Sequence, residues 1–328
     1  MSAPVVAVVV PCYRVARQVL DVLARIGPEV SRIYVVDDAC PERTGERVRS
    51  ECADPRVIVI EHKQNRGVGG AVTTGYRAAL ADGSDIVVKI DGDGQMDPAA
   101  LPHIAGPVVA GLADYAKGNR FYDFELLQEM PRGRLIGNAL VSLVNKMASG
   151  YWDVMDPTNG YTAIHRAALA RLPLDKLDPR YFFESDMLFR LYTIRAVVRD
   201  VALPARYRDE TSSLSLSHSA AVFPAKYGKA AMKRVFYAYF LRDFNAGTVL
   251  LLLGFVLAAF GAIFGGLEWH RSVLTGVPTT SGTVMLAALP LLIGVQLLLS
   301  ALHFDIQNVP REPLQRLHRP WTEALRGQ

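Results

Sequence analysis

The sequence predicts an α/β domain with a mostly parallel, doubly wound sheet, followed by a pair of membrane-spanning helices. Four short apolar runs rich in β-branched residues recur within the first part of the chain, and helix-compatible segments separate them. Two stretches near the C-terminus are apolar, uncharged and long. At 328 residues the chain has room for one large α/β domain plus accessory segments.

The predicted strands and helices alternate along the chain. We expect strands at residues 5–10, 33–36, 57–60 and 86–90, and helices at 16–26, 44–51, 71–81, 133–147 and 184–195. Alternation of this kind is typical of parallel sheets, whose strands are buried on both faces and therefore form continuous apolar runs. In such sheets ligands bind beyond the carboxyl ends of the strands. Pro11, Asp37-Asp38 and Asp91 lie at three of these ends.

A basic and aromatic helix is expected over residues 223–244. Lys226, Lys229 and Lys233 fall within an arc of about 60° on this helix, and aromatic residues such as Phe223 and Tyr227 are interleaved with them. This pattern suits a helix in the membrane interface, with its lysines toward anionic headgroups and its rings in the acyl boundary. A soluble amphipathic helix is the alternative.

The two apolar stretches, residues 248–267 and 282–302, are each long enough for a helix to cross about 30 Å of hydrocarbon. Buried core helices are the alternative. Positive residues flank the pair, whereas the connector between them holds only Arg271 as a positive residue. We therefore expect both termini on the cytoplasmic side of the cell membrane. The first residues lack the basic start and the apolar length of a signal peptide, so the α/β domain is expected in the cytosol too.

These patterns divide the chain into four expected parts. They are a cytoplasmic α/β domain at 1–222, a juxtamembrane amphipathic helix at 223–245, a transmembrane hairpin at 246–303 and a cytoplasmic tail at 304–328.

Cysteine usage and charge exclude several classes of protein. Cys12, Cys40 and Cys52 are an odd, scattered set without the spacing of a zinc site or of a disulfide framework. Free thiols in a reducing compartment fit best. The net charge of +4 is modest and is partly explained by the membrane flanks, so it does not indicate a nucleic-acid partner.

Asp91-Gly92-Asp93-Gly94-Gln95 follows an apolar run, and its glycines let the backbone turn tightly. Two carboxylates two residues apart offer the oxygen ligands that Mg²⁺ or Mn²⁺ prefers, and such an ion completes its shell with water and substrate phosphates. Because a second acidic pair lies at another strand end, a metal–diphosphate site is favoured over a chance loop motif.

Two other segments allow a functional or a structural interpretation. Asp37-Asp38 could accept hydrogen bonds from a nucleotide base or ribose, or could cap a turn or helix. The glycine-rich segment from Asn65 to Ala71 opens a helix and could cradle a phosphate. It is neither a Walker A sequence nor a dinucleotide-binding one, so its glycines could equally serve backbone shape alone.

Taken together, the motifs VVVPCYR, VVDDAC, NRGVGGAVTTGYRAAL and VVKIDGDGQMDP resemble the family 2 glycosyltransferases of GT-A fold. The later GNRF, DPTNGYTAIHR and YFFESDMLFRL resemble the polyprenyl-phosphate branch of that family, which includes dolichyl-phosphate mannose synthases and bacterial prenyl-phosphate glucosyltransferases. The resemblance covers about residues 5–245, and the hairpin is similar to that of the bacterial members.

The resemblance implies a nucleotide-sugar site. The residues that it places around the base, ribose and diphosphate are Pro11, Tyr13, Asp37, Asp38, Arg66, Gly67, Asp91 and Gln95. Asp91 and Asp93 would hold Mg²⁺ or Mn²⁺. Val68 stands where many relatives carry lysine, so any phosphate contact of this loop would come from Arg66 or from the backbone.

The resemblance also implies catalytic residues, which are Asp93, Arg120 and Asp156. Asp156 matches a base or acceptor-orienting carboxylate, and Arg120 matches an arginine near the donor and acceptor phosphates. One further acidic residue facing the active site is implied at Glu184 or Asp186. The partners of the acceptor phosphate stay open among residues that could equally be solvated or lipid-facing, namely Arg132, Arg134, Arg206 and Arg208.

The expected function is metal-dependent, inverting transfer of a sugar from a UDP-sugar or GDP-mannose to polyprenyl phosphate at the cytoplasmic membrane face. A homo-oligomer is left open. A processive polysaccharide synthase is disfavoured because the Gln-x-x-Arg-Trp motif of those enzymes is missing. Transfer to another lipid or to a protein is the closer alternative. A non-catalytic nucleotide-binding membrane scaffold is disfavoured because Asp91, Asp93 and Asp156 are all present.

Overall fold

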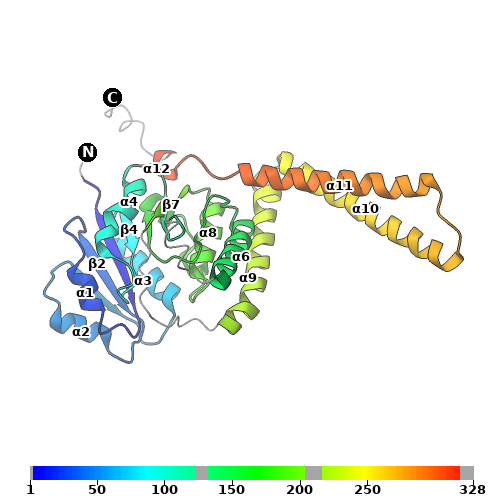
Figure 1. The fold of residues 1–328 in the computed structure, drawn as a ribbon. Helices are drawn as coiled ribbons and strands as arrows, with labels where there is room; N and C mark the ends of the chain where they lie inside the picture. Colours follow the sequence, from blue (N-terminus) through cyan, green and yellow to red (C-terminus); the bar gives the residue numbers. More distant parts are fainter. Residues whose placement is uncertain (1–2, 123–131, 204–215, 318–328) are drawn as a thin grey trace. The chain divides into compact units, whose positions relative to one another are not determined.

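The computed structural model describes residues 3–122, 132–203 and 216–317. The chain forms two compact units, Met1–Arg234 together with Pro310–Gln328, and Val235–Val309. The first unit is built on a seven-stranded sheet, and the second contains two long apolar helices (Figure 1). The predicted fold class is therefore confirmed.

The sheet has the strand order β3-β2-β1-β4-β6-β5-β7. All neighbouring strands are parallel except for β6, which runs antiparallel to both β4 and β5. The four apolar runs of the sequence are the first four strands. The strands are β1 Val6–Cys12, β2 Arg32–Asp37, β3 Val57–Glu61, β4 Ile86–Lys89, β5 Tyr115–Asn119, β6 Thr162–His165 and β7 Val198–Ala202.

The helices also follow the predicted order. The observed α2 has the predicted bounds, whereas α1 is shorter than predicted and α3 begins earlier, within the glycine-rich segment. The helices that join or flank the strands are α1 Val19–Ala24, α2 Thr44–Glu51, α3 Val68–Ala81, α4 Leu101–Val109, α6 Arg132–Ser149, α7 Arg166–Leu169, α8 Phe183–Thr193, α9 Leu216–Phe236 and α12 Leu314–Leu317, with short 3₁₀ turns η1 Pro98–Ala100 and η2 Leu174–Lys176.

Helices cover both faces of the sheet. Successive side chains of a strand point to opposite faces, so residues of one strand pack against different helices. Val8 and Val10 of β1 belong to a core that they share with α1 and α4. Val9 faces α3 instead, and the approach is so close that a Cβ on Gly75 would lie 2.4 Å from Val9 Cγ1. The first apolar run is thus buried on both sides, as expected for a central parallel strand.

The aromatic side of α9 packs against the α/β domain. The rings of Phe182 and Tyr227 lie 5.0 Å apart, and Phe223 packs edge-on against both of them. Tyr227 Oη is 2.8 Å from Ser185 Oγ of α8. The expectation that Phe223 and Tyr227 lie in the acyl boundary is therefore wrong.

The lysines of α9 do not share one environment. Lys226 forms an ion pair with Asp178, and its ammonium lies 5.4 Å from the centre of the Phe182 ring. Lys229 and Lys233 are exposed. The lysine spacing that predicted headgroup contact therefore places Lys226 against an acid and an aromatic ring of the α/β domain instead.

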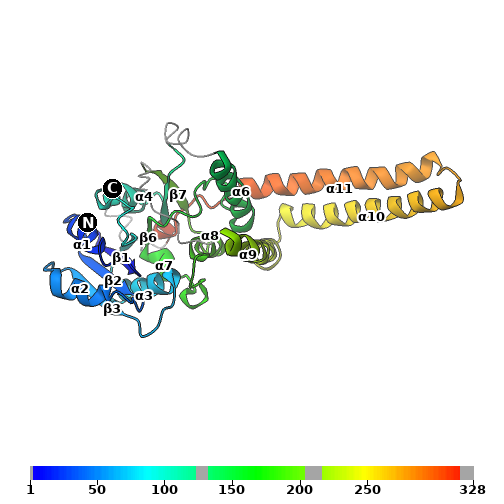
Figure 2. The same ribbon diagram turned by 60° about the horizontal axis from the view of Figure 1, so that its bottom comes forward.

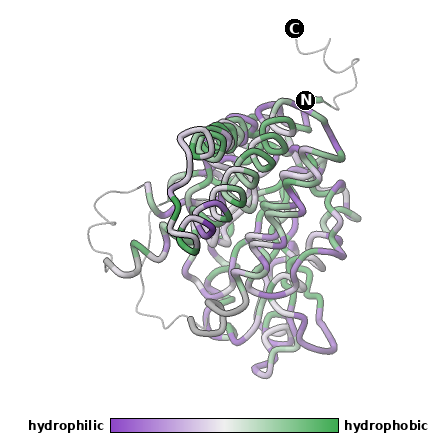
Figure 3. Tube along the Cα trace, turned by 90° about the vertical axis from the view of Figure 1, so that its right-hand side faces the viewer, coloured by the Kyte–Doolittle hydropathy of each residue, from purple (hydrophilic) through white to green (hydrophobic). Residues whose placement is uncertain are grey.

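The second unit is a helical hairpin. It begins with the π-helical turn η3 Tyr237–Leu241 and continues with α10 Ala246–Thr275 and α11 Ser281–Gln307, which run side by side (Figure 2). Both helices are long and apolar enough to cross a membrane, and they are mostly hydrophobic along their length (Figure 3). Only 11% of the most apolar window of each helix is buried within the protein. Core helices of a soluble domain would be mostly buried, so that alternative does not fit.

Candidate active site

The candidate residues gather where the parallel strands end, around the carboxyl end of the central strand β1. This strand pairs with β2 on one side and with β4 on the other, so the strand order reverses there, which is where open α/β sheets bind ligands. Thr162, the first residue of antiparallel β6, lies opposite Lys89 of β4 and Lys117 of β5. The segment just before β6 therefore reaches the same edge as the carboxyl ends of β1, β2, β4 and β5, which we name the active-site edge.

A buried lysine links Asp91 to Glu184 at this edge. Lys89 is 1% exposed, and its Nζ lies 2.8 Å from Asp91 Oδ1 and 3.2 Å from Glu184 Oε1. A Cβ on Gly160 would lie 2.4 Å from the same Nζ. The glycine of DPTNGY thus leaves room for the lysine, and three separate sequence motifs meet around one ammonium group.

Lys89 keeps its charge because its partners outweigh its burial. Burial acts to lower the pKa of Lys89, but Asp91 and Glu184 together raise this pKa above its ordinary value. The ammonium therefore offsets part of the negative charge of the two carboxylates. The sequence analysis missed this residue, although a charged residue inside the apolar run IVVKI was a usable signal.

The acidic pair after β2 holds the chain around it. Asp37 accepts hydrogen bonds from Cys40 N at 2.7 Å and from Gly45 N at 2.6 Å, so it caps the turn into α2. Asp38 is 2% exposed and accepts from Arg66 N at 2.8 Å and from Gly67 N at 2.7 Å. These contacts favour the structural interpretation of the pair.

A histidine that the sequence analysis did not single out completes the contacts of Asp38. His62 Nδ1 lies 2.7 Å from Asp38 Oδ1, and His62 Nε2 lies 2.9 Å from Thr74 Oγ1 of α3. Asp38 is therefore the point at which β2, the loop after β3 and the start of α3 are joined.

The glycine-rich loop is shaped by close packing. Gly67 has a φ of +82°, and a Cβ on it would lie 2.4 Å from Pro179 O. A Cβ on Gly69 would lie 2.2 Å from Asp178 O, and Gly70 N donates to Pro179 O at 3.1 Å. Since several loop amides already bond to Asp38 or Pro179, the structure favours backbone shape over a phosphate cradle.

The end of β1 presents an exposed aromatic ring. Pro11 is buried within the strand, while Tyr13 is 44% exposed and its ring lies 5.4 Å from the guanidinium of Arg14. Arg14 has a φ of +58° and Ala39, beyond β2, a φ of +53°. Left-handed backbone costs a non-glycine residue about 1 kcal/mol or more and is enriched at functional sites.

Arg120 and Asp156 form a bidentate pair. Arg120 Nε donates to Asp156 Oδ2 at 2.8 Å, and Nη2 donates to Oδ1 at 3.1 Å. The Asp156 side chain is 1% exposed, whereas that of Arg120 is 36% exposed. Fork-to-fork pairing of this kind fixes orientation as well as charge. The buried carboxylate therefore holds an arginine that remains open to the outside.

Charge around Asp156 keeps it ionised despite its burial. Burial acts to raise the pKa of Asp156, but hydrogen bonding and charge from Arg120, with a contribution from Lys117, bring this pKa below its ordinary value. Lys117 is fully buried in β5, and burial lowers its pKa to about 8. Lys117 donates to the carbonyl of Asn159, so it also supports the DPTNGY segment.

The remaining predicted residues are placed as follows. Gln95 is exposed, and its backbone N donates to Asp93 Oδ1 at 3.0 Å. Asp186 does not join Glu184 at Lys89, because it pairs with Arg190 at 2.9 Å and accepts from Asp178 N. Arg66 is exposed at the mouth of the glycine-rich loop. Of the four candidates for the acceptor phosphate, Arg132 and Arg134 lie in the first turn of α6, and Arg206 and Arg208 lie outside the described residues.

The two carboxylates after β4 suit a divalent cation that is shared with a diphosphate. The Asp91 side chain is 29% exposed, and Asp93 lies two residues further along the same turn. Among residues 3–122, 132–203 and 216–317, no group of three or more His, Cys, Asp or Glu side chains could hold an ion by itself. Mg²⁺ or Mn²⁺ bound through one or two carboxylates plus substrate phosphates needs no such group, so the residues fit.

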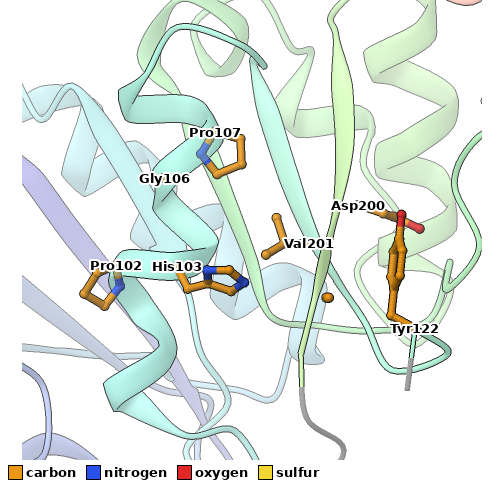
Figure 4. Close-up of a pocket in the computed structure, with 8 residues that line it drawn as sticks. Pro102, His103, Gly106, Pro107, Tyr122, Asp200 and Val201 are labelled. Carbon is orange, nitrogen blue, oxygen red and sulfur yellow. The ribbon is translucent and has the colours of Figure 1, made fainter. Parts of the chain in front are cut away.

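An open pocket of about 430 Å³ lies away from Asp91, beside α4 and β7. Figure 4 shows His103 and Pro107 of α4 on one side and Asp200 and Tyr122 on the other. Lys89, Asp91, Arg120 and Asp156 are not among the residues that line this pocket. Asp200 lines this pocket and also accepts hydrogen bonds from the segments that carry Arg120 and Asp156.

The chain matches known proteins over the α/β domain. Residues 7–172 match the model of the family Glycosyl transferase family 2. The chain is 32% identical to the undecaprenyl-phosphate mannosyltransferase of Micrococcus luteus, over 62% of this chain and 83% of that protein. It is 27% identical to the UDP-N-acetylglucosamine–dolichyl-phosphate N-acetylglucosaminyltransferase of Methanococcus voltae, over 55% of this chain and 77% of the relative.

A solved structure gives the same fold. Glucosyl-3-phosphoglycerate synthase from Mycobacterium tuberculosis, in complex with Mn²⁺, UDP-glucose and phosphoglyceric acid, matches with a TM-score of 0.52 and 20% identity, over 70% of this chain and 79% of that one. At this identity the likeness establishes the fold alone. The family match shows that the chain belongs to glycosyl transferase family 2 and is a glycosyltransferase, and the named relatives show that it resembles the polyprenyl-phosphate branch of that family.

Proposed function

We propose that this glycosyltransferase moves a sugar from a nucleotide sugar to a polyprenyl phosphate at the cytoplasmic face of a membrane. The observation that carries the proposal is the convergence of Asp91, Asp93 and the Arg120–Asp156 pair at one sheet edge, in a chain that also contains an apolar hairpin. The named relatives that act on dolichyl phosphate and undecaprenyl phosphate support the choice of acceptor.

The donor would lie along the carboxyl ends of β1, β2 and β4. Tyr13 offers an exposed ring beside this edge, and Asp38 fixes the neighbouring loop. The diphosphate would reach Asp91 and Asp93, which would hold Mg²⁺ or Mn²⁺. When bound, that cation would offset the charge of the departing nucleoside diphosphate. The solved relative with Mn²⁺ and UDP-glucose supports this arrangement.

The acceptor phosphate would approach from the side of Arg120. A phosphate oxygen of the lipid attacks the anomeric carbon, a new carbon–oxygen bond forms, and the bond from that carbon to the nucleoside diphosphate breaks. Direct displacement inverts the configuration of the sugar. The acceptor is already ionised near neutral pH, so Asp156 is assigned to orienting Arg120 and the acceptor, and not to removing a proton. Arg120 would stabilise the negative charge that develops on the departing nucleoside diphosphate.

Membrane attachment would bring the enzyme to its acceptor. Two apolar helices of the length of α10 and α11 cost less free energy in hydrocarbon than in water, where most of their apolar residues would be at least partly exposed. A site held at the lipid surface meets a lipid phosphate more often than a free one would, because tethering raises the effective concentration. We assign the α/β domain and both termini to the cytoplasmic side.

The proposal is tested with the full chain purified in detergent. Radiolabelled UDP-glucose, UDP-N-acetylglucosamine and GDP-mannose are offered in turn with undecaprenyl phosphate and with Mg²⁺ or Mn²⁺. Label is expected in an organic-extractable, acid-labile lipid. Asp91→Asn and Asp93→Asn should each lower kcat/KM by about 100-fold or more, because each removes a charged ligand from the diphosphate site.

The exposed Glu51 at the C-terminal end of α2 supplies the control, since Glu51→Gln removes one carboxylate on the side of the sheet where the strands begin and should leave the rate unchanged. Full transfer by both Asn variants in excess chelator would show that Asp91 and Asp93 do not hold a required metal ion. Label that appears only in protein or in polysaccharide would show that the acceptor is not polyprenyl phosphate.

A further inference from the structure

Asp200 of β7 lies behind the Arg120–Asp156 pair and binds both segments that carry it. Its Oδ2 accepts one hydrogen bond from Asn119 Nδ2 at 2.7 Å and another from Met155 N at 2.8 Å. Asn119 and Met155 are the residues immediately before Arg120 and Asp156. A single carboxylate oxygen therefore joins the two segments whose next residues form the bidentate pair.

Asn119 carries this link past Arg120. It is 3% exposed, and its Oδ1 accepts a hydrogen bond from Phe121 N at 2.8 Å while its Nδ2 donates to Asp200. Leu203 N also donates to Asn119 O at 3.1 Å. The backbone is thus fixed on both sides of Arg120, and the hydrogen bonds with Asp200 and Leu203 tie it to β7 and to the residue after β7.

Lys117 secures the opposite side of the Asp156 segment. It is the register partner of Asp200 in the parallel pair of β5 and β7, and it donates to the carbonyl of Asn159. The short segment around Asp156 is therefore anchored at Met155 by Asp200 and at Asn159 by Lys117. Two adjacent strands hold the segment at both ends, which leaves the Asp156 carboxylate little freedom to move.

We propose that Asp200 is a positioning residue, which sets the distance and orientation between Arg120 and Asp156 without touching the substrate. This inference rests on the proposed function, because that function assigns Arg120 and Asp156 to the phosphate groups. Positioning matters because a displacement of about 1 Å in a catalytic group costs on the order of 100-fold in rate. The role belongs to the acceptor oxygen of Asp200, since both donors converge on that one atom.

Asp114 gives a matched comparison, because its carboxylate also accepts backbone hydrogen bonds, at the other end of the β5–β7 strand pair. It is fully buried just before β5 and accepts hydrogen bonds from Val197 N at 2.8 Å and from Leu314 N at 2.9 Å. Loss of Asp114 also removes a buried acceptor between β5 and β7, but at the end of the strands away from Arg120.

The experiment compares Asp200→Ala, Asp200→Asn and Asp114→Ala in the full chain, with the nucleotide sugar that supports transfer and undecaprenyl phosphate as acceptor. Asp200→Ala should lower kcat by about 10-fold to 100-fold, with the donor KM within about 2-fold of wild type. Asp200→Asn should recover most of this loss, because its Oδ1 can accept both hydrogen bonds. Asp114→Ala should lower Tm while keeping kcat within about 3-fold of wild type.

A second readout does not depend on the reaction. Hydrogen exchange of peptides that cover residues 118–121 and 155–161 should accelerate in Asp200→Ala and not in Asp200→Asn or Asp114→Ala. If wild type transfers no sugar to undecaprenyl phosphate, the proposed function fails, while the exchange data still test the link made by Asp200.

Two results would overturn the inference: an unchanged kcat in Asp200→Ala, or equal losses of kcat in Asp200→Ala and Asp114→Ala. Should Asp200→Ala fail to fold, Asn119→Ala removes one of the two donors and is expected to lower kcat with an unchanged donor KM. Unchanged kcat in Asn119→Ala would then count against the assignment.

Discussion

Two buried lysines and one partly buried aspartate support the candidate site from within the sheet. Lys89 bridges Asp91 and Glu184, Lys117 holds the carbonyl of Asn159, and Asp200 joins the segments before Arg120 and Asp156. None of them is among the site residues predicted from the sequence, although Lys89 lies within the motif VVKIDGDGQMDP. Removing charged groups from water costs free energy unless each one is paired or hydrogen-bonded. These residues therefore lower the stability of the fold while they fix the geometry of the candidate site.

Asp200 should make stability depend on pH between about 4 and 6. Burial, only partly offset by hydrogen bonds and by Lys117, raises the pKa of Asp200 to about 6 from its ordinary value of 3.8. In this range the folded protein holds a proton at Asp200 that the unfolded chain has released, so stability falls as pH rises. Compared with Asp200→Asn, wild type should lose about 2 kcal/mol of unfolding free energy between pH 4 and pH 7 and then level off.

This prediction is checked by thermal unfolding of wild type and Asp200→Asn in detergent at pH 4, 5, 6, 7 and 8. The difference in Tm between the two proteins should change between pH 4 and pH 7 and stay constant above pH 7. A difference that is the same at every pH would show that Asp200 does not titrate in the folded protein in this range.

Among the elements, α3 illustrates how glycine determines where a helix can lie. Its first turn passes so close to the segment before α8 that Gly69 faces Asp178 O, and its third turn rests on β1 through Gly75 and Val9. Both approaches exclude a side chain. The loop that precedes α3 is bound to Asp38, so hydrogen bonds connect the start of this helix to the end of β2.

Gly69→Ala should therefore destabilise the α/β domain. The added Cβ would lie 2.2 Å from Asp178 O and 2.8 Å from Phe183 Cδ2, which demands a backbone shift and costs about 1–3 kcal/mol. Gly228→Ala in the middle of α9 is the control, because a Cβ there has no neighbour within 4 Å and removes the helix penalty of glycine, worth up to about 1 kcal/mol. Thermal unfolding should show a lower Tm for the first variant and an equal or higher Tm for the second. An unchanged Tm in Gly69→Ala would contradict the packing described for this turn.

At the scale of the whole molecule, the chain leaves the α/β unit for the hairpin and then returns to it. The helices of the hairpin approach closely at small residues, and a Cβ on Gly294 would lie 2.3 Å from Ala258 N. Residues 310–317 belong to the first unit, where Gln315 Nε2 donates to Val108 O and to Ala113 O. In the proposed membrane arrangement, the antiparallel α10 and α11 would put the connector between them on one side of the membrane and both flanks on the other.

Cysteine accessibility tests this topology. In a chain with Cys52→Ser, whose Cys12 and Cys40 are buried, Val277→Cys lies in the connector and Glu312→Cys lies after α11. A membrane-impermeant thiol reagent added to intact cells should label Val277→Cys and spare Glu312→Cys, and it should label both after the membrane is opened. Equal labelling of the two positions in intact cells would rule out a spanning hairpin with both flanks inside.

Local pattern determined much of this protein: the first four strands, the helices between them, the apolar hairpin and the acidic strand ends were all evident from the sequence, because period and composition report burial directly. What pattern could not reveal was which long-range partners meet. Antiparallel β6 brings DPTNGY beside Asp91, and α8 brings Glu184 to Lys89. Asp37 and Asp38 are bound within the protein, and Lys226 pairs with Asp178 and not with lipid. These outcomes depend on contacts between residues far apart in the chain, so only the tertiary structure decides them.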